Sequence, residues 1–339
     1  MARIAARSVV CTLLLCAAVS MTACDTADQT SGPAPDKLKL IALPLLSWAP
    51  FDIAEAEGFF AEQNLEVEFI RLARPSDALP ALAQGSVDIG AGLLTVGLMN
   101  AIAGGARIKL VADKGHLAAD GCTHSALLVT RSLVESGALD QPDQLRGLRL
   151  EINALLPEAF YTDLVLHEVG LTLDDLEIVT LPPAAEPDAL ATGAVDLMVA
   201  AEPQITLMEA TGNAVVWRRG EQVLPGTQWA SVLYGRSLLD ERPEVGERFM
   251  VAYLKAVRQY NEGKTPRNVE VLMNRTGLEE DLLRSACWPP IGNDIRVQAA
   301  SLLGYQEWAV SRGIAERVLS EDELVDHHFA EHANAVLAR

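Results

Sequence analysis

A nine-residue segment occurs twice in this chain, and it constrains the fold more than any other feature of the sequence. Residues 81–89 read ALAQGSVDI and residues 189–197 read ALATGAVDL, so Ala-Leu-Ala, the glycine and Val-Asp are shared. Each copy is typical of a helix that ends at a glycine in the left-handed conformation and is followed at once by a strand. The two copies therefore predict two similar halves, although such a string could also be a common helix-to-strand transition.

The residues that flank the two copies correspond as well. The sequence predicts a strand, a helix and a strand before each copy, at 38–43, 51–63 and 66–72 in the first half and at 148–152, 160–169 and 176–181 in the second. Each half is then β-α-β-α-β, which predicts an α/β fold with mostly parallel sheets flanked by helices. From residue 243 onward the apolar periodicity predicts helices alone, so we expect a helical C-terminal tail that covers one lobe.

Length and charge narrow the class of protein further. The chain has 339 residues, which fits two domains. It carries 46 acidic and 27 basic residues, for a net charge of −19. Because so acidic a body repels a phosphate backbone, we expect no nucleic-acid partner.

The first residues predict export. Two arginines precede an apolar run over 9–19, a pattern typical of a signal peptide and too short to span a membrane. The following Met-Thr-Ala-Cys resembles a bacterial lipobox, in which Cys24 is lipidated, and ordinary secretion is the alternative. We predict a signal peptide at 1–23, a flexible tether at 24–36, and anchoring at the periplasmic or extracytoplasmic face of the cell membrane through lipid on Cys24.

Two cysteines remain beyond the anchor. Cys122 and Cys287 could form one disulfide in an oxidising compartment, or could stay as two buried thiols.

A longer segment resembles a known family. Residues 50–67 read PFDIAEAEGFFAEQNLEV, and shorter supporting matches lie at 82–90, 145–150, 200–203 and 242–244. Over most of residues 37–339 the chain resembles the SsuA-like group of ABC-transporter substrate-binding proteins. That group includes binders of alkanesulfonates, taurine, nitrate and the pyrimidine precursor of thiamine.

The resemblance implies a fold and a role. The fold is the two-lobed type II periplasmic-binding architecture, with lobe 1 at 37–120 and 223–339 and lobe 2 at 121–222. The role is non-catalytic: a monomer without a cofactor captures a small solute between the lobes and delivers it to a membrane permease and its ATPase. A remote alternative is an enzyme like the thiamine-precursor synthases of the same fold.

Ligands of open α/β sheets bind beyond the carboxyl ends of the strands, which selects candidate binding residues. They lie in the loops after the predicted strands, at the helix starts that follow, and near the two crossovers between lobes: Ser47, Trp48, Phe51, Leu93, Thr95, His124, Asn153, Phe160, Glu202 and Trp229. Several have a structural alternative: a helix cap for Thr95 and Glu202, core packing for Trp48, and a purely structural role for His124 and Trp229.

The chemistry of these loops bears on the solute. The four loops at 46–49, 92–95, 153–155 and 200–203 contain no Lys or Arg, while Glu202 could accept hydrogen bonds from an amine or an aminopyrimidine. We therefore expect a neutral or cationic, pyrimidine-like heteroaromatic solute. A small anion such as a sulfonate, taurine or nitrate is the alternative, because backbone N–H groups at helix starts can bind anions. We predict no metal site: His328 and His332 have metal-ligand spacing but fit a solvated helix.

Overall fold

The computed structural model describes residues 33–43, 45–71, 77–117, 119, 122, 125–181 and 185–339. The predicted signal peptide, the predicted lipidation site Cys24 and the candidate binding residue His124 lie outside these ranges. Residues 35–339 form one compact unit. Within the described residues, every helix is too short or too polar to cross a membrane.

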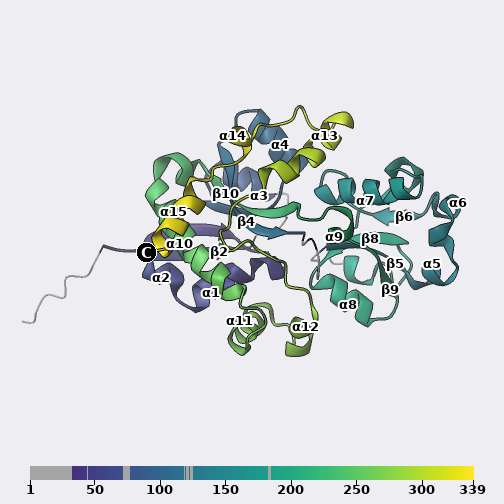
Figure 1. Cartoon of the computed structure of the whole chain (residues 1–339), viewed down its shortest axis with the longest axis horizontal. Helices are drawn as coiled ribbons and strands as arrows, with labels where there is room; N and C mark the ends of the chain where they lie inside the picture. Colours follow the sequence, from purple (N-terminus) through teal and green to yellow (C-terminus); the bar gives the residue numbers. More distant parts are fainter. Residues whose placement is uncertain are drawn as a thin grey trace, which may run out of the picture. The chain divides into compact units, whose positions relative to one another are not determined.

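The fold is built on two five-stranded sheets (Figure 1). The first has the order β2 (Leu65–Ile70), β1 (Asp36–Ile41), β3 (Ile89–Leu93), β10 (Gln228–Gly235) and β4 (Ile108–His116). The second has the order β7 (Glu177–Val179), β6 (Arg149–Glu151), β8 (Leu197–Ala201), β5 (Ser125–Thr130) and β9 (Ala214–Arg219). We call the parts around these sheets lobe 1 and lobe 2.

One strand in each sheet runs against the others. Strand β10 pairs antiparallel with both β3 and β4, and β5 pairs antiparallel with both β8 and β9. The remaining pairs, β1 with β2 and β3 and β6 with β7 and β8, are parallel. Four strands of each sheet therefore share a direction, and the predicted mostly parallel α/β architecture is confirmed.

Two segments carry the chain between the sheets. The first, residues 117–124, joins β4 to β5, and the second, residues 220–227, joins β9 to β10. The first segment begins beside the end of the second, because the Leu117 N–H donates to the Thr227 carbonyl at 2.9 Å and the Gly226 N–H donates to the Leu117 carbonyl at 2.7 Å.

The two copies of the repeat form the same local structure. Gly85 and Gly193 have φ angles of +72° and +67°, a conformation that a side chain would strain. Two residues after each glycine, the valine N–H donates to the carbonyl of the copy's first alanine at 3.3 Å. The helix predicted in the second copy is wrong, however. The first copy lies in α3 (Ala78–Ala83), whereas the second forms turns after the short 3₁₀ helix η5 (Glu186–Asp188).

The repeated aspartate fastens each copy to the neighbouring strand. In lobe 1, the backbone N–H of Lys39 donates to Asp88 Oδ2 at 2.9 Å, and the Asp88 N–H donates to the Lys39 carbonyl at 3.0 Å. In lobe 2, Arg149 and Asp196 make the same two bonds, both at 2.9 Å. The repeated Val-Asp pair of the sequence thus has a structural function in both lobes.

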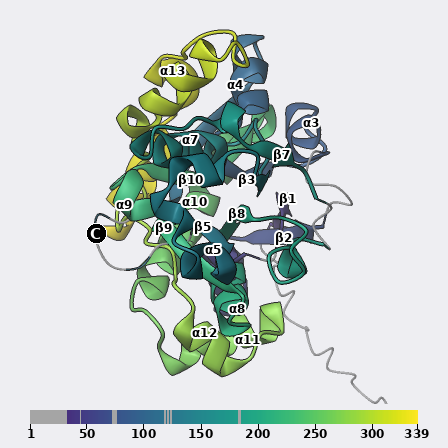
Figure 2. The same cartoon turned by 90° about the vertical axis from the view of Figure 1, so that its right-hand side faces the viewer.

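Helices cover both faces of each sheet (Figures 1 and 2). In lobe 2, α7 (Pro157–Glu168) and α8 (Gln204–Ala210) lie on opposite sides of the strands. The remaining short elements are η1 (Leu46–Trp48), α1 (Ala49–Ala56), α2 (Phe59–Glu62), α4 (Val96–Ala103), α5 (Arg131–Glu135), η3 (Ala138–Asp140), α6 (Pro142–Leu145), η4 (Leu173–Asp175) and α9 (Gly220–Val223). The single helix predicted over 51–63 is interrupted by a turn between α1 and α2.

The C-terminal tail is helical, as predicted. Its elements are η6 (Ser237–Glu241), α10 (Pro243–Tyr260), α11 (Pro266–Thr276), α12 (Glu280–Ser285), η7 (Ala299–Leu302), α13 (Leu303–Ser311), α14 (Glu321–Leu324) and α15 (His328–Leu337). Most of it packs on lobe 1, where α10 contacts α1 and α15. Helices α12 and α13 also contact α8 and α7 of lobe 2, so the tail does not cover one lobe alone.

The core of lobe 1 takes one predicted binding residue. Phe51 is wholly buried, and its ring lies 5.0 Å from that of Tyr253 and 6.2 Å from that of Phe249, both on α10. This placement follows from helix spacing, because α1 turns Phe51 away from the strand ends and onto the long apolar face of α10. We therefore correct our expectation for Phe51, which is a core residue.

Candidate functional site

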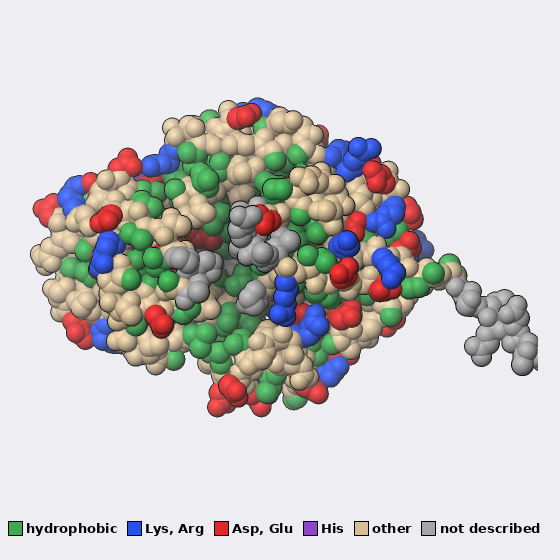
Figure 3. Space-filling view, turned by 180° about the vertical axis from the view of Figure 1, so that it is seen from behind, with side chains coloured by type: hydrophobic (Ala, Val, Ile, Leu, Met, Phe, Trp, Pro, Cys, Tyr) green, Lys and Arg blue, Asp and Glu red, His purple; other side chains and the backbone are tan. Residues whose placement is uncertain are grey.

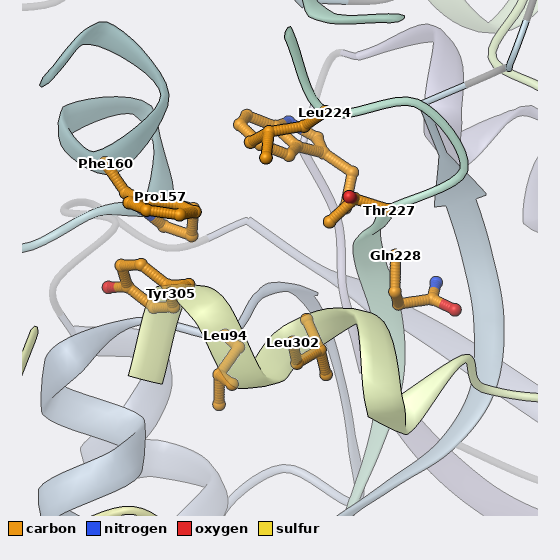
Figure 4. A pocket seen from close by; sticks show the side chains of 9 residues that line it. Leu94, Pro157, Phe160, Leu224, Thr227, Gln228, Leu302 and Tyr305 are labelled. Carbon is orange, nitrogen blue, oxygen red and sulfur yellow. The ribbon is translucent and has the colours of Figure 1, made fainter. Parts of the chain in front are cut away.

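A small apolar cavity lies where lobe 1, lobe 2 and the tail meet (Figure 4). Its lining residues come from all three parts: Leu94, Thr227, Gln228 and Trp229 around the first sheet, Leu224 in the second crossover, Pro157 and Phe160 on α7, and Leu302 and Tyr305 in the tail. The free volume is about 10 Å³, room for about one water molecule. Side chains of the protein therefore fill this part of the space between the lobes.

Two predicted binding residues meet in this cavity. Phe160 projects from the first turn of α7 toward Tyr305, and the two ring centroids are 6.1 Å apart. Trp229, near the start of β10, is buried and lies edge-on to Tyr161 at 6.4 Å. Leu94, between the predicted residues Leu93 and Thr95, lines the same cavity. The sequence thus identified part of the lining, but it gave no signal for the tail residue Tyr305.

Contacts from the tail and from α4 hold the lobes together around the cavity. The Trp308 indole donates to Asp163 Oδ2 at 2.8 Å, and its ring lies 5.8 Å from that of Phe160. On the other side, the Leu155 carbonyl accepts from the Val96 N–H at 3.1 Å and from the Tyr305 hydroxyl at 3.2 Å. Seen from behind, the molecule has hydrophobic side chains around its hollowed middle (Figure 3). The cavity is too small for a solute of several atoms, which can enter only if these contacts separate.

Two more predicted residues surround a buried lysine. Lys114, near the end of β4, donates to Ser47 Oγ at 2.7 Å, and its Nζ lies 3.4 Å from the centre of the Trp48 ring. All three side chains are buried, and the Trp48 indole donates to the Ile41 carbonyl. Burial lowers the pKa of Lys114 well below its usual value, against the opposing effect of Asp113. The Lys114 amino group therefore occupies the face of the Trp48 ring that we expected to stack on a ligand.

The other loop residues have local structural roles. Thr95 caps α4, since its Oγ1 accepts from the Leu98 N–H at 3.0 Å. Asn153 is exposed, and its Oδ1 accepts from the Leu155 N–H at 3.0 Å. Leu93 is half-buried at the end of β3.

Glu202 is a buried capping residue that also joins the lobes. Its carboxylate accepts from the backbone N–H and the hydroxyl of Thr206, in the first turn of α8, at 3.2 and 2.9 Å. It also accepts from the Cys287 N–H, in the tail, at 3.0 Å. Three donors of the protein thus occupy the group that we expected to bind a ligand.

The same region contains a disulfide, which resolves the alternative left open by the sequence. Cys122 in the first crossover is bonded to Cys287 just after α12. The bond ties the crossover to the tail.

A group of carboxylates in lobe 2 escaped the sequence analysis. Glu151 ends β6, Glu158 lies in the first turn of α7 between Pro157 and Phe160 of the cavity, and Glu186 follows β7. Burial, reinforced by Glu186, raises the pKa of Glu151 to about 7. Burial, reinforced by Glu151, raises the pKa of Glu158 to about 7 as well. The signal was present in the sequence, because Glu151 and Glu158 flank the loop after a predicted strand.

Metal ligands are not gathered anywhere in the described part of the chain. No three His, Cys, Asp or Glu side chains converge there in a metal-binding arrangement. His328 and His332 both approach Glu247, with the nearer ring nitrogen 2.7 Å from Glu247 Oε1.

Comparisons with known proteins identify the family of this chain. The profile of the family described as "NMT1/THI5 like" matches residues 47–262, well over half of the chain. The chain belongs to the NMT1/THI5-like family. A search of curated proteins returns no significant match.

Solved structures similar to this NMT1/THI5-like protein share its fold at low identity. The ligand-binding component of an ABC-type import system from Staphylococcus aureus is 17% identical, with a TM-score of 0.74 over 88% of this chain and 99% of that chain. The alkanesulfonate-binding protein SsuA from Xanthomonas axonopodis pv. citri is 18% identical, with a TM-score of 0.65 over 87% and 99%. The desulfurization enzyme DSZB is 15% identical, with a TM-score of 0.62 over 90% and 100%. These likenesses confirm the predicted two-lobed periplasmic-binding fold.

Proposed function

We propose that this protein is the substrate-binding component of an ABC importer, which captures a small solute between its lobes and delivers it to a permease and its ATPase. The cavity that both lobes and the tail line is the observation that carries the proposal. The paired crossovers supply the hinge about which the lobes would open to admit a solute. We take the lobe limits as 37–120 with 223–339, and 121–222.

The cavity lining supports a neutral or cationic, heteroaromatic solute as our first choice. Phe160, Trp229 and Tyr305 offer aromatic contact, and the described lining has no charged side chain. Micromolar affinity needs about 8 kcal/mol, which one charged hydrogen bond of about 1.5–3 kcal/mol cannot supply. Most of the binding energy would have to come from burying the aromatic faces of the solute and of these three residues.

A small anion, such as a sulfonate, taurine or nitrate, is the second candidate, and Lys114 is the observation that favours it. A buried lysine beside Ser47, close to the end of β4, could bind an anion if the neighbouring loop moved. The four loops at 46–49, 92–95, 153–155 and 200–203 contain no Lys or Arg, which is why this remains the second choice.

A thermal-shift screen tests both choices at once. Its panel contains pyrimidines, aromatic amines, sulfonates, nitrate and aromatic acids, with Phe160→Ala as the site variant. We expect a hit among the neutral or cationic aromatic compounds, lost in Phe160→Ala. A hit confined to sulfonates or nitrate would favour the second candidate, and the absence of any hit would contradict the proposed capture.

The proposed role is non-catalytic, although an enzyme shares the fold. Incubating the protein with each hit and analysing the mixture by mass spectrometry separates the two roles. Unchanged compound is expected, whereas a product would favour an enzyme such as a thiamine-precursor synthase.

We further propose that a monomer works at the extracytoplasmic face of the membrane, held by lipid on Cys24. Mass spectrometry of the protein from a host with the lipoprotein pathway should show a lipidated Cys24 as the new N-terminus. A free Cys24, or a mature chain that begins elsewhere, would contradict the anchor.

A further inference from the structure

Helix α7 carries, beside two residues that line the aromatic cavity, a carboxyl group with one oxygen that has no hydrogen-bond partner among the described residues. Glu158 is flanked in the first turn of α7 by Pro157 and Phe160, which both line the cavity. Its Oε2 is shielded from solvent and has no hydrogen-bond partner among the described residues. A carboxyl oxygen buried without a donor costs free energy in the solute-free protein, so a role in binding is a reason to retain it.

Two further carboxylates and one phenol surround this group. Glu151 interacts electrostatically with Glu158 from the end of β6, and Glu186 interacts with Glu151 from η5. Across the cavity, burial and the nearby Glu158 raise the pKa of the Tyr305 hydroxyl. No interaction of Glu158 with a lysine or an arginine compensates for this negative charge in the described structure.

The position agrees with the general rule for ligand sites in α/β sheets. Glu151 is the last residue of β6, and Glu158 is the second residue of the helix that follows, so both lie at the carboxyl end of a parallel strand. The part of the aromatic cavity that α7 lines and the Glu158 carboxyl therefore belong to the same end of lobe 2. The first offers surface for a flat apolar body, and the second offers an acceptor for N–H donors.

We propose that Glu158, supported by Glu151 and Glu186, binds the N–H-rich cationic end of the solute, an amidinium or a protonated aminoheterocycle, while Phe160 and Tyr305 contact its ring. This inference rests on the proposed solute capture and narrows its solute class. Glu202 cannot play this part in the closed structure, because its carboxylate already accepts from Thr206 and Cys287.

The test uses three probes with the same ring and different charge: benzamidine, benzamide and benzoate. Their affinities for the whole protein are measured by isothermal titration calorimetry. We expect benzamidine to bind about ten-fold or more tightly than benzamide, the ratio that one charge-assisted hydrogen bond supplies. The variant Glu158→Gln should remove that ratio by weakening benzamidine about ten-fold, and should leave benzamide within about two-fold.

A matched control lies on the same helix. Glu168, at the other end of α7, is exposed and pairs with Arg218 at 3.3 Å. Glu168→Gln should leave the affinities of all three probes unchanged. Thermal melting of both variants checks that each is folded.

Proton release gives a second readout that a purely structural role would not produce. With a pKa of about 7, Glu158 is about half protonated at pH 7, and a bound cation favours its ionised form. Benzamidine should therefore release up to about half a proton at pH 7, seen as a binding enthalpy that depends on the buffer, and Glu158→Gln should abolish this release.

The outcomes separate this inference from the proposed function. Equal affinities for benzamidine and benzamide, or tight benzamidine binding unaffected by Glu158→Gln, would overturn the role of Glu158. Binding of benzoate or another screened solute without benzamidine would also overturn it, and would leave solute capture standing. Failure of every probe and of the whole screen would overturn solute capture itself.

Discussion

Replacement of Glu158 by Gln should remove a pH-dependent cost from the solute-free protein. Burial raises the pKa of Glu158 from 4.5 to about 7, so the folded state holds this proton more tightly than the unfolded state does. Below about pH 4.5 both states are protonated and the carboxyl costs nothing. As the pH rises from there to about 7, the unfolded state ionises first and the free energy of unfolding falls; above about 7 the cost is constant.

The magnitude follows from the size of the shift. Each unit of pKa corresponds to about 1.4 kcal/mol, so a rise from 4.5 to about 7 costs the ionised folded state about 3 kcal/mol. Most of that cost appears between pH 5 and pH 8. Glu158→Gln has no ionisable group at this position. Between pH 5 and pH 8 the free energy of unfolding of the parent should therefore fall by about 2–3 kcal/mol more than that of the variant.

Urea unfolding at pH 5 and pH 8, followed by circular dichroism, measures the difference. Titrating groups away from this cluster are common to parent and variant, so the comparison isolates Glu158 together with its coupling to Glu151. Glu168→Gln, with its exposed carboxylate, should follow the parent. Parallel pH profiles for Glu158→Gln and the parent would show that the Glu158 carboxyl is solvated in the free protein, and would refute the reasoning.

Three other changes probe the contacts that shape the protein. Trp308→Phe removes the indole donor to Asp163, a hydrogen bond worth about 1.5–3 kcal/mol, and should favour an open state with a larger radius of gyration in X-ray scattering. An unchanged radius of gyration would show that this hydrogen bond does not hold the lobes together. A chain of residues 33–339 should show no free thiol when it is denatured without reductant and two free thiols after reduction. The double variant Cys122→Ser with Cys287→Ser should lower the free energy of unfolding in urea by about 2–5 kcal/mol. Reactive thiols before reduction would disprove the disulfide. Asp88→Asn loses charge-assisted bonds between the repeat and its neighbours and should lower the free energy of unfolding by about 1–3 kcal/mol; no loss would show that the repeat is not fastened as described.

The fold could be predicted because its determinants are local. The repeat around Gly85 and Gly193 predicts the same turn and strand in both lobes, and the structure gives both copies the same hydrogen bonds. The amphipathic pattern over α10 and the purely helical tail follow from spacing alone. The helix expected before Gly193 failed because the bonds around that glycine need only a turn.

The candidate site was harder to predict because it depends on contacts between distant parts of the chain. The sequence places Phe160 and Trp229 near strand ends, but not Tyr305, which reaches the cavity from the tail. Glu202 occupies the expected loop, yet the Cys287 N–H donor that occupies its carboxylate comes from 85 residues away. Lys114 escaped notice because it lies within β4 instead of in a loop, and only the folded structure shows it beside Ser47.

The proposed function requires that a solute bind between the lobes, at the cavity that is too small for it in the described structure. Titrating a hit from the solute screen while recording tryptophan fluorescence tests it most directly, because Trp229 and Trp308 both contact the cavity or its lining. We predict a saturable change with one solute per protein, weakened about ten-fold or more by Phe160→Ala. A response of the same affinity in Phe160→Ala, or no saturable response to any compound, would contradict the claim.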